Sequence, residues 1–151
     1  MPPWNPWADL GSRAHVTLAI RPLPGPVRGV YHRRGSRAVI VLASALGRRA
    51  RNATLAHELV HDERGGGAAF AGQPASWEPV VARDERRVDD EVARRLVPGG
   101  ELDSLWRRAR GVDGCLGPRE VAAAFDVPLD VATRALELRR PTRRHPRRSG
   151  R

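Results

Sequence analysis

The stretch TLAHELVHDERGG, residues 54–66, places two histidines four positions apart, His57 and His61, with Glu58 directly after the first. The rest of the stretch is largely apolar and predicts a buried helix. Side chains four positions apart lie about 40° apart on one helix face, so both imidazoles can reach one metal ion. Zinc is the expected ion, because it prefers imidazole nitrogens at about 2.0–2.1 Å. Glu58, about 100° around the helix, is placed to take a proton from a water molecule there.

Two histidines alone do not make a catalytic zinc site, which needs three protein ligands and one open position. The extended pattern with a third histidine is absent, because Arg64 and Gly67 occupy its glycine and histidine positions. A carboxylate from further along the chain is therefore required. The helical stretch 80–97 offers five of them: Asp84, Glu85, Asp89, Asp90 and Glu91.

Helical geometry separates these five acids into two groups. With about 100° between successive residues, Glu85 lies at the centre of the apolar face and Asp89 at its edge. The apolar residues of this face are Val81, Val88, Val92 and Leu96. The acids expected to point toward water are Asp84, Asp90 and Glu91.

A carboxylate on a buried face is costly unless it is paired or binds a metal. We therefore expect Glu85 to be the third zinc ligand, beside His57 and His61. Asp89, one turn further along, is placed to accept the free N–H of a ligating histidine and to fix its tautomer. The alternative for Glu85 is a salt bridge with one of the many arginines.

The hydrophobic pattern before and after this motif predicts an α+β fold. Alternating or β-branched runs at residues 15–20, 27–32 and 37–44 indicate strands, and RRGS at 33–36 supplies turn chemistry for a hairpin. Helical patterns follow at 46–63 and 80–97, and then in three shorter segments. We expect a small antiparallel sheet of about three strands, the motif helix, a second ligand-bearing helix and a small C-terminal helical bundle.

These patterns divide the chain into three parts. Residues 1–98 hold the expected zinc-binding catalytic domain, 99–138 a helical region with helix-turn-helix-like spacing, and 139–151 an arginine-rich tail expected to be disordered. The net charge is +10, and all 27 basic residues are arginine. Removing the seven arginines of the tail leaves +3, so the body is nearly balanced. Contact of the tail with nucleic acid is an alternative to a simply solvated tail.

Several features indicate a cytoplasmic protein. The chain lacks a run of about 18 apolar residues, so no membrane span is expected. Its first residues show no basic segment followed by an apolar one, so no secretion signal is expected. A single cysteine excludes an internal disulfide and fits a reducing compartment.

Two stretches together resemble the ImmA/IrrE family of metallo-endopeptidases: LAHELVHDERG at 55–65 and ERRVDDEVARRLVP at 85–98. The family has an A-H-E-L-x-H helix and later a helix in which Glu85 falls on the ligand glutamate and Asp89 on an Asn/Asp position. The resemblance covers roughly residues 15–137. Val60 departs from the usual glycine between the histidines, and Glu91 stands where an aromatic residue is common. Neither departure touches the expected ligands.

The resemblance implies a cytoplasmic bacterial zinc peptidase that cuts a helix-turn-helix repressor, with Zn²⁺ as its cofactor and Glu58 as the base. No membrane partner is expected. For the oxyanion, Tyr31 and His32 are candidates, and the strand RAVIVLA at 37–43 is a candidate for pairing with an extended substrate. Two other hypotheses stay open: a DNA-binding regulator that uses the helical pair around 126–128 and the basic tail, and a non-cutting antirepressor.

Overall fold

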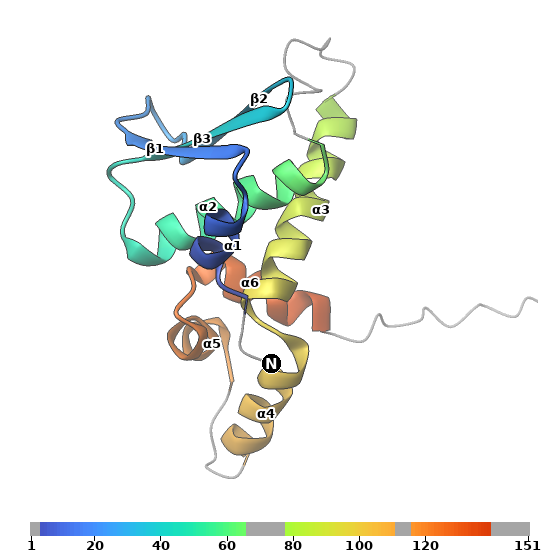
Figure 1. The fold of residues 1–151 in the computed structure, drawn as a ribbon. Coiled ribbons are helices and arrows are strands. Elements are labelled where there is room, and N and C mark those ends of the chain that lie inside the picture. Colours follow the sequence, from blue (N-terminus) through green and yellow to red (C-terminus); the bar gives the residue numbers. More distant parts are fainter. Residues whose placement is uncertain (1–3, 66–77, 111–115, 140–151) are drawn as a thin grey trace, which may run out of the picture.

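The computed structural model describes residues 4–65, 78–110 and 116–139. Its elements follow one another as α1, three strands and five further helices (Figure 1). Their bounds are α1 Pro6–Ser12, β1 Val16–Arg21, β2 Gly29–Arg34, β3 Arg37–Ala43, α2 Arg48–Glu63, α3 Glu78–Leu96, α4 Gly99–Arg110, α5 Pro118–Phe125 and α6 Leu129–Arg139. The α+β class is confirmed, although one helix, α1, precedes the three strands. The expected tail lies outside the described residues beyond Arg139.

The sheet is mixed, so the prediction of an antiparallel sheet was wrong for one of its two pairings. Strands β2 and β3 form the expected antiparallel hairpin, with Gly35 at φ +60° in its turn. Strand β1, however, pairs with β3 in parallel, and the strand order is β1-β3-β2. The alternating pattern of β1 determines which face of the strand is buried. It does not reveal which strand β1 pairs with, or whether that pairing is parallel or antiparallel. The segment between β1 and β2 carries the chain to the far edge, and the hairpin then returns β3 to the middle.

The central position of β3 also excludes the expected pairing of this strand with a substrate. Both of its edges are already hydrogen-bonded, one to β1 and the other to β2. A strand can be added only to a free edge, where backbone N–H and C=O groups are unpaired. The proposal for 37–43 was therefore wrong, and its apolar residues serve the core instead: Ile40 and Leu42 are fully buried.

Helix α2 lies under the sheet and joins two clusters of the core (Figure 1). Leu55 and Leu59 pack against the inner face of the sheet. Ala56 and Val60 belong to the second cluster, which α3 and the C-terminal helices complete. Residues 54–62 of α2 are buried at every position except His57. A helix surrounded in this way is held firmly in place, which gives its histidines a fixed direction.

The C-terminal helices pack on α3 and share its core. Val121 and Val127 are buried beside Val88 and Val92 of α3, and Ala132 and Ala135 of α6 join the same cluster. Ion pairs from Asp126 to two arginines of α2, Arg48 and Arg49, fasten the turn between α5 and α6 to the start of α2. The expected packing of the C-terminal helices as a small bundle is confirmed for α5 and α6 by this core. This shared core places α6 against α3, the helix that carries Glu85.

Helix α1 was not expected from the sequence. The Asn5 side chain accepts hydrogen bonds from the backbone N–H groups of Trp7 and Ala8, and Pro6 occupies the first turn. Asparagine as N-cap followed by proline is a recognised helix start, so the signal was present in the sequence. The helix packs on α2, and Trp4 before it contacts both core clusters.

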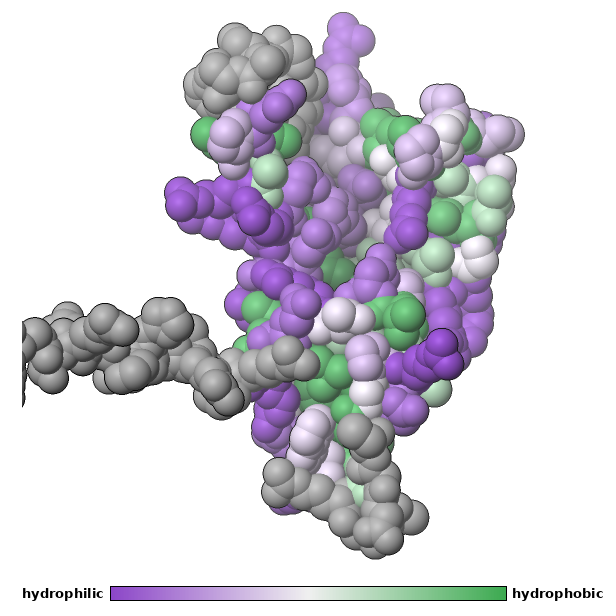
Figure 2. Space-filling model, turned by 180° about the vertical axis from the view of Figure 1, so that it is seen from behind, coloured by the Kyte–Doolittle hydropathy of each residue, from purple (hydrophilic) through white to green (hydrophobic). Residues whose placement is uncertain are grey.

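The outer surface is mostly hydrophilic on the face seen from behind, with apolar side chains in separate patches (Figure 2). Within the described ranges, no helix combines the length and apolar content needed to cross a bilayer.

Candidate metal centre

Helices α2 and α3 bring His57, His61 and Glu85 to one point. The His57 Nε2 atom lies 3.1 Å from His61 Nε2 and 3.2 Å from Glu85 Oε2. His61 Nε2 lies 3.3 Å from Glu85 Oε1. The ligand-type atoms of the three residues all lie within 4.8 Å of one another. The three residues expected to share a metal ion are thus adjacent, although Glu85 lies on another helix, 24 positions after His61 in the chain.

The spacing of these atoms suits a small tetrahedral ion. Donors on the corners of a tetrahedron at zinc's bond length of about 2.0–2.1 Å are about 3.3–3.4 Å apart. The two imidazole Nε2 atoms are 3.1 Å apart, and they lie 3.2 and 3.3 Å from two different oxygens of Glu85. Two imidazoles and one carboxylate are also a ligand set found in catalytic zinc sites. The donor types therefore fit zinc, and the three ligand-type atoms lie close enough together to share one ion.

Asp89 lies where an orienting acid is expected. Its Oδ1 is 3.1 Å from Nδ1 of His57, the ring nitrogen that does not face His61 and Glu85. Burial lowers the pKa of His57, but hydrogen bonds to Asp89 and Glu85 outweigh this and raise it well above its ordinary value. Hydrogen bonds from His57 and His61 hold the pKa of the Glu85 carboxyl far below its usual range. The centre is therefore arranged to attract positive charge.

His61 differs from His57 in lacking such an orienting partner. Its Nδ1 atom is buried and has no hydrogen-bond partner among the described residues. Its position is instead fixed by packing, since the residue is only 5% exposed.

Glu85 is less buried than its place on the helical face predicted. Its side chain is 45% exposed, whereas those of Asp84 and Asp90, expected to face water, are only 20% and 21% exposed. The prediction of their exposure was wrong because arginines on neighbouring elements cover them. Asp84 pairs with Arg64 and Asp90 with Arg134. Contact with the Nε2 atoms of both histidines, and not burial, distinguishes Glu85 from the other acids of α3.

Glu58 is buried beside the centre without a hydrogen-bond partner among the described residues. It is 6% exposed, and burial raises the pKa of its carboxyl, although the nearby His57 and His61 oppose this. A carboxyl group held in this way binds a proton more readily than a solvated one. Its environment fits a group that accepts and returns a proton during a reaction.

Gly29, at the start of β2, was not recognised from the sequence. A Cβ atom there would lie 2.6 Å from Oε1 of Glu58 and 2.6 Å from Cγ2 of Thr54, so only glycine lets the strand approach α2 so closely. One glycine before a β-branched run carries no signal of this, because the close approach depends on two elements that meet in space.

A cleft of about 360 Å³ opens beside the histidine helix. Its walls come from the segment 26–29, from α2 and α3, and from the beginning of α6. Tyr31 and His32, the expected oxyanion candidates, do not line it. Tyr31 is buried and donates a 2.7 Å hydrogen bond to Asp62, so its hydroxyl is already used. His32 points to the opposite side of the sheet and is exposed.

Asp62, one turn after Glu58, is the centre of a separate network. Its carboxylate accepts hydrogen bonds from Tyr31, from Arg13 at 2.8 Å and from His15 at 2.9 Å. Burial raises the pKa of Asp62, but these three partners together lower it below its ordinary value. The network joins α1, β1 and β2 to the end of α2.

No known protein family matches this chain, and no curated protein resembles it significantly. The resemblance to the ImmA/IrrE family therefore depends on the two sequence motifs and stays a prediction.

Proposed function

We propose that this protein is a zinc-dependent endopeptidase. The observation that carries the proposal is the convergence of His57, His61 and Glu85, with the buried Glu58 on the same helix as both histidines. Structural zinc sites have four protein ligands, whereas three ligands leave a position for water or substrate. Within the described residues only these three form such a group, which favours a catalytic role.

Each residue of the centre has a distinct part in the proposed reaction. His57, His61 and Glu85 hold the ion, and Asp89 fixes the ring of His57 by accepting its Nδ1–H. Bound zinc would supply a Lewis acid that activates water and polarises the peptide carbonyl. Glu58 accepts the proton of the attacking water at its carboxylate and delivers it to the departing amine. Gly29 keeps open the space that the Glu58 carboxylate occupies.

The proposed substrate is a protein, and the resemblance to ImmA/IrrE peptidases favours a helix-turn-helix repressor in the bacterial cytoplasm. The cleft beside His57 and Glu58 gives a peptide access to both residues. The closeness of α6 to this cleft supports a role for the C-terminal helices in holding the substrate. This is an alternative to a role in reading DNA.

Metal content and cleavage test the proposal together. We expect the purified protein to bind one zinc ion and, when loaded, to cut a library of short peptides of mixed sequence, with products identified by mass spectrometry. Glu85→Ala should lose most of the zinc, whereas the matched variant Asp90→Ala should retain it. Glu58→Gln should retain zinc and lose cleavage by at least about 100-fold. Equal metal loss in the two α3 variants, or undiminished cleavage by Glu58→Gln, would overturn the proposal.

Binding measurements with a repressor and with duplex DNA, added to that experiment, separate the two other hypotheses. An antirepressor would bind zinc and a repressor but cut no peptide. A DNA-binding regulator would bind duplex DNA with an affinity that falls when residues 139–151 are removed, and it would not depend on zinc.

A further inference from the structure

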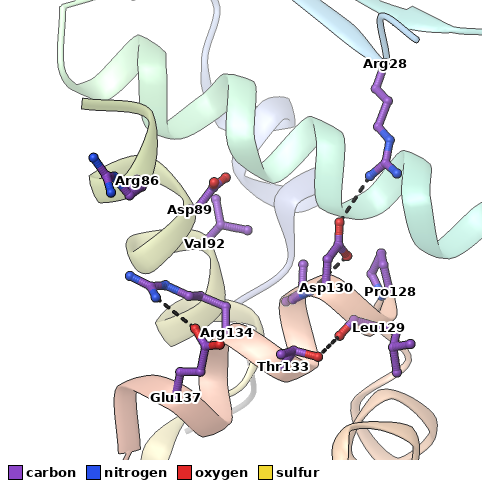
Figure 3. Close-up of a pocket in the computed structure, with 11 residues that line it drawn as sticks. Arg28, Arg86, Asp89, Val92, Pro128, Leu129, Asp130, Thr133, Arg134 and Glu137 are labelled. Carbon is purple, nitrogen blue, oxygen red and sulfur yellow. Dashed lines mark hydrogen bonds and ion pairs between the residues drawn. The ribbon is translucent and has the colours of Figure 1, made fainter. Parts of the chain in front are cut away.

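The cleft at the metal centre continues into a second hollow on the C-terminal helices. This second hollow has a volume of about 780 Å³ and lies between α3 and α6 (Figure 3). The two hollows share five lining residues: Arg28, Asp89, Val92, Asp130 and Val131. Shared walls make them parts of one groove that leads from His57 and Glu58 to α6. A peptide bound beside His57 and Glu58 would extend into this groove.

An ion pair marks the junction of the two hollows. Arg28, from the segment before β2, reaches down to Asp130 in the first turn of α6 (Figure 3). The Arg28 Nη1 atom is 3.2 Å from the Asp130 carboxylate, and the two side chains are 59% and 62% exposed. Because both are open to solvent, a ligand in the groove can touch either one.

The hydrogen-bonding capacity left at this junction is mainly that of a donor. Asp130 accepts bonds both from Arg28 and from the backbone N–H of Val131. Among the other acids of the groove, Asp89 contacts His57 and Glu137 accepts from Arg134, whereas Glu58 lies at the far end, beside His57. Arg28 has five N–H groups and, within the described part of the chain, uses one of them in a side-chain hydrogen bond. An incoming carboxylate can therefore bind Arg28 without breaking its pair with Asp130.

We propose that Arg28 selects an acidic side chain of the peptide substrate, close to the bond that is cut. This inference rests on the proposed peptidase function and assigns the substrate class of the same site. A guanidinium group suits the task because its planar N–H groups match a carboxylate. The apolar neighbours Val92, Leu129 and Val131 would contact the flanking part of the peptide.

The peptide library gives two independent measurements of this preference. Affinity selection on immobilised, zinc-loaded Glu58→Gln protein reports binding, and digestion by the zinc-loaded wild-type chain reports cleavage. We expect Asp and Glu to exceed Asn and Gln by about three- to fivefold at one position beside the cut, as an exposed ion pair gives. Arg28→Gln should abolish this preference, and Arg28→Glu should reverse it toward Lys and Arg. Asp130→Asn should preserve or increase it.

The matched control is Arg33→Gln, which removes the same charge from the same strand region outside the groove. Arg33 donates to the backbone oxygen of Gly35 in the hairpin turn. Its variant should retain the wild-type preference. A profile without acidic enrichment, or one that Arg28→Gln leaves unchanged, would overturn the inference. Acidic enrichment in the selection without any cleavage would support the role of Arg28 in binding and would contradict the peptidase function instead.

Discussion

Glu58 and Asp62 are two buried acids on one helix, one turn apart, and they differ in whether hydrogen-bond donors surround the carboxylate. They are almost equally buried, at 6% and 5% exposure. Asp62 receives hydrogen bonds from Tyr31, Arg13 and His15, whereas Glu58 has no such partner among the described residues. Burial raises the pKa of both carboxyls, but only in Asp62 do hydrogen bonds reverse the shift.

The contrast teaches that burial alone does not reveal the role of an acid. A buried carboxylate with three donors stabilises the fold and stays ionised, while one without donors costs stability and remains ready to bind a proton. Unsatisfied polar groups of this kind are expected at functional sites, where the rest of the structure must compensate for them. Four predictions test this comparison.

The largest expected effect is a difference in sign between matched amide substitutions, measured by denaturant unfolding without metal. Asp62→Asn should lower the free energy of unfolding by about 2 kcal/mol, because the fold favours its charged form. Glu58→Gln should leave stability unchanged or raise it by up to about 1 kcal/mol, because it removes a poorly solvated charge. Equal destabilisation by both substitutions would contradict the comparison.

The second prediction concerns the glycine that makes room for Glu58. Gly29→Ala should destabilise the protein by about 2 kcal/mol and reduce cleavage, because the new Cβ meets Glu58 and Thr54 at 2.6 Å. Gly100→Ala is the control, since nothing lies within 4 Å of its Cβ. It should be neutral or slightly stabilising in the same thermal and denaturant unfolding measurements. If both alanines are tolerated alike, the contact between β2 and Glu58 is not as tight as described.

The third prediction tests the Asp62 network by alkaline titration. Burial, followed by the hydrogen bond to Asp62, raises the pKa of Tyr31 from 10 to about 12. The folded state thus retains a proton that the unfolded chain loses, so stability is complete below pH 10 and falls as pH rises through 12. The loss should be about 2 kcal/mol.

The composition of the chain makes this titration easy to observe. Tyr31 is the only tyrosine, and the chain has no lysine that would titrate in the same range. Tyrosinate absorbance should report the pKa directly, and Tyr31→Phe should remove most of the dependence on pH between 10 and 12. An absorbance midpoint near 10 would show that the hydroxyl is not engaged with Asp62.

The smallest expected effect lies at the metal centre itself. Asp89→Asn should weaken zinc binding by about tenfold, because the amide is a poorer acceptor for the His57 Nδ1–H. Competition with a chromogenic chelator measures this affinity. Asp90→Asn is the control on the neighbouring position, since Asp90 pairs with Arg134 and not with a histidine. Similar weakening in both variants would remove Asp89 from the site.

Much of the fold and of the candidate site was predictable because the signals are local. The strands, the two functional helices and the adjacency of His57 to His61 all follow from short-range periodicity. Glu85 was also identified correctly as the acid that faces the histidines, although the reasoning from burial was only partly right. The exposure of Asp84 and Asp90 was misjudged because a helical projection shows nothing of Arg64 and Arg134, which come from other elements.

By itself the sequence determined which groups are available for the candidate metal centre: two imidazoles on one helical face, a carboxylate between them in the chain, and a later acidic helix. These follow from residue type and from the fixed geometry of the helix. Only the tertiary structure decided the parallel pairing of β1, the need for glycine at position 29, and the meeting of Arg28 with Asp130, 102 residues apart. Such contacts depend on how whole elements pack, and packing between distant segments leaves no local periodic signal in the chain.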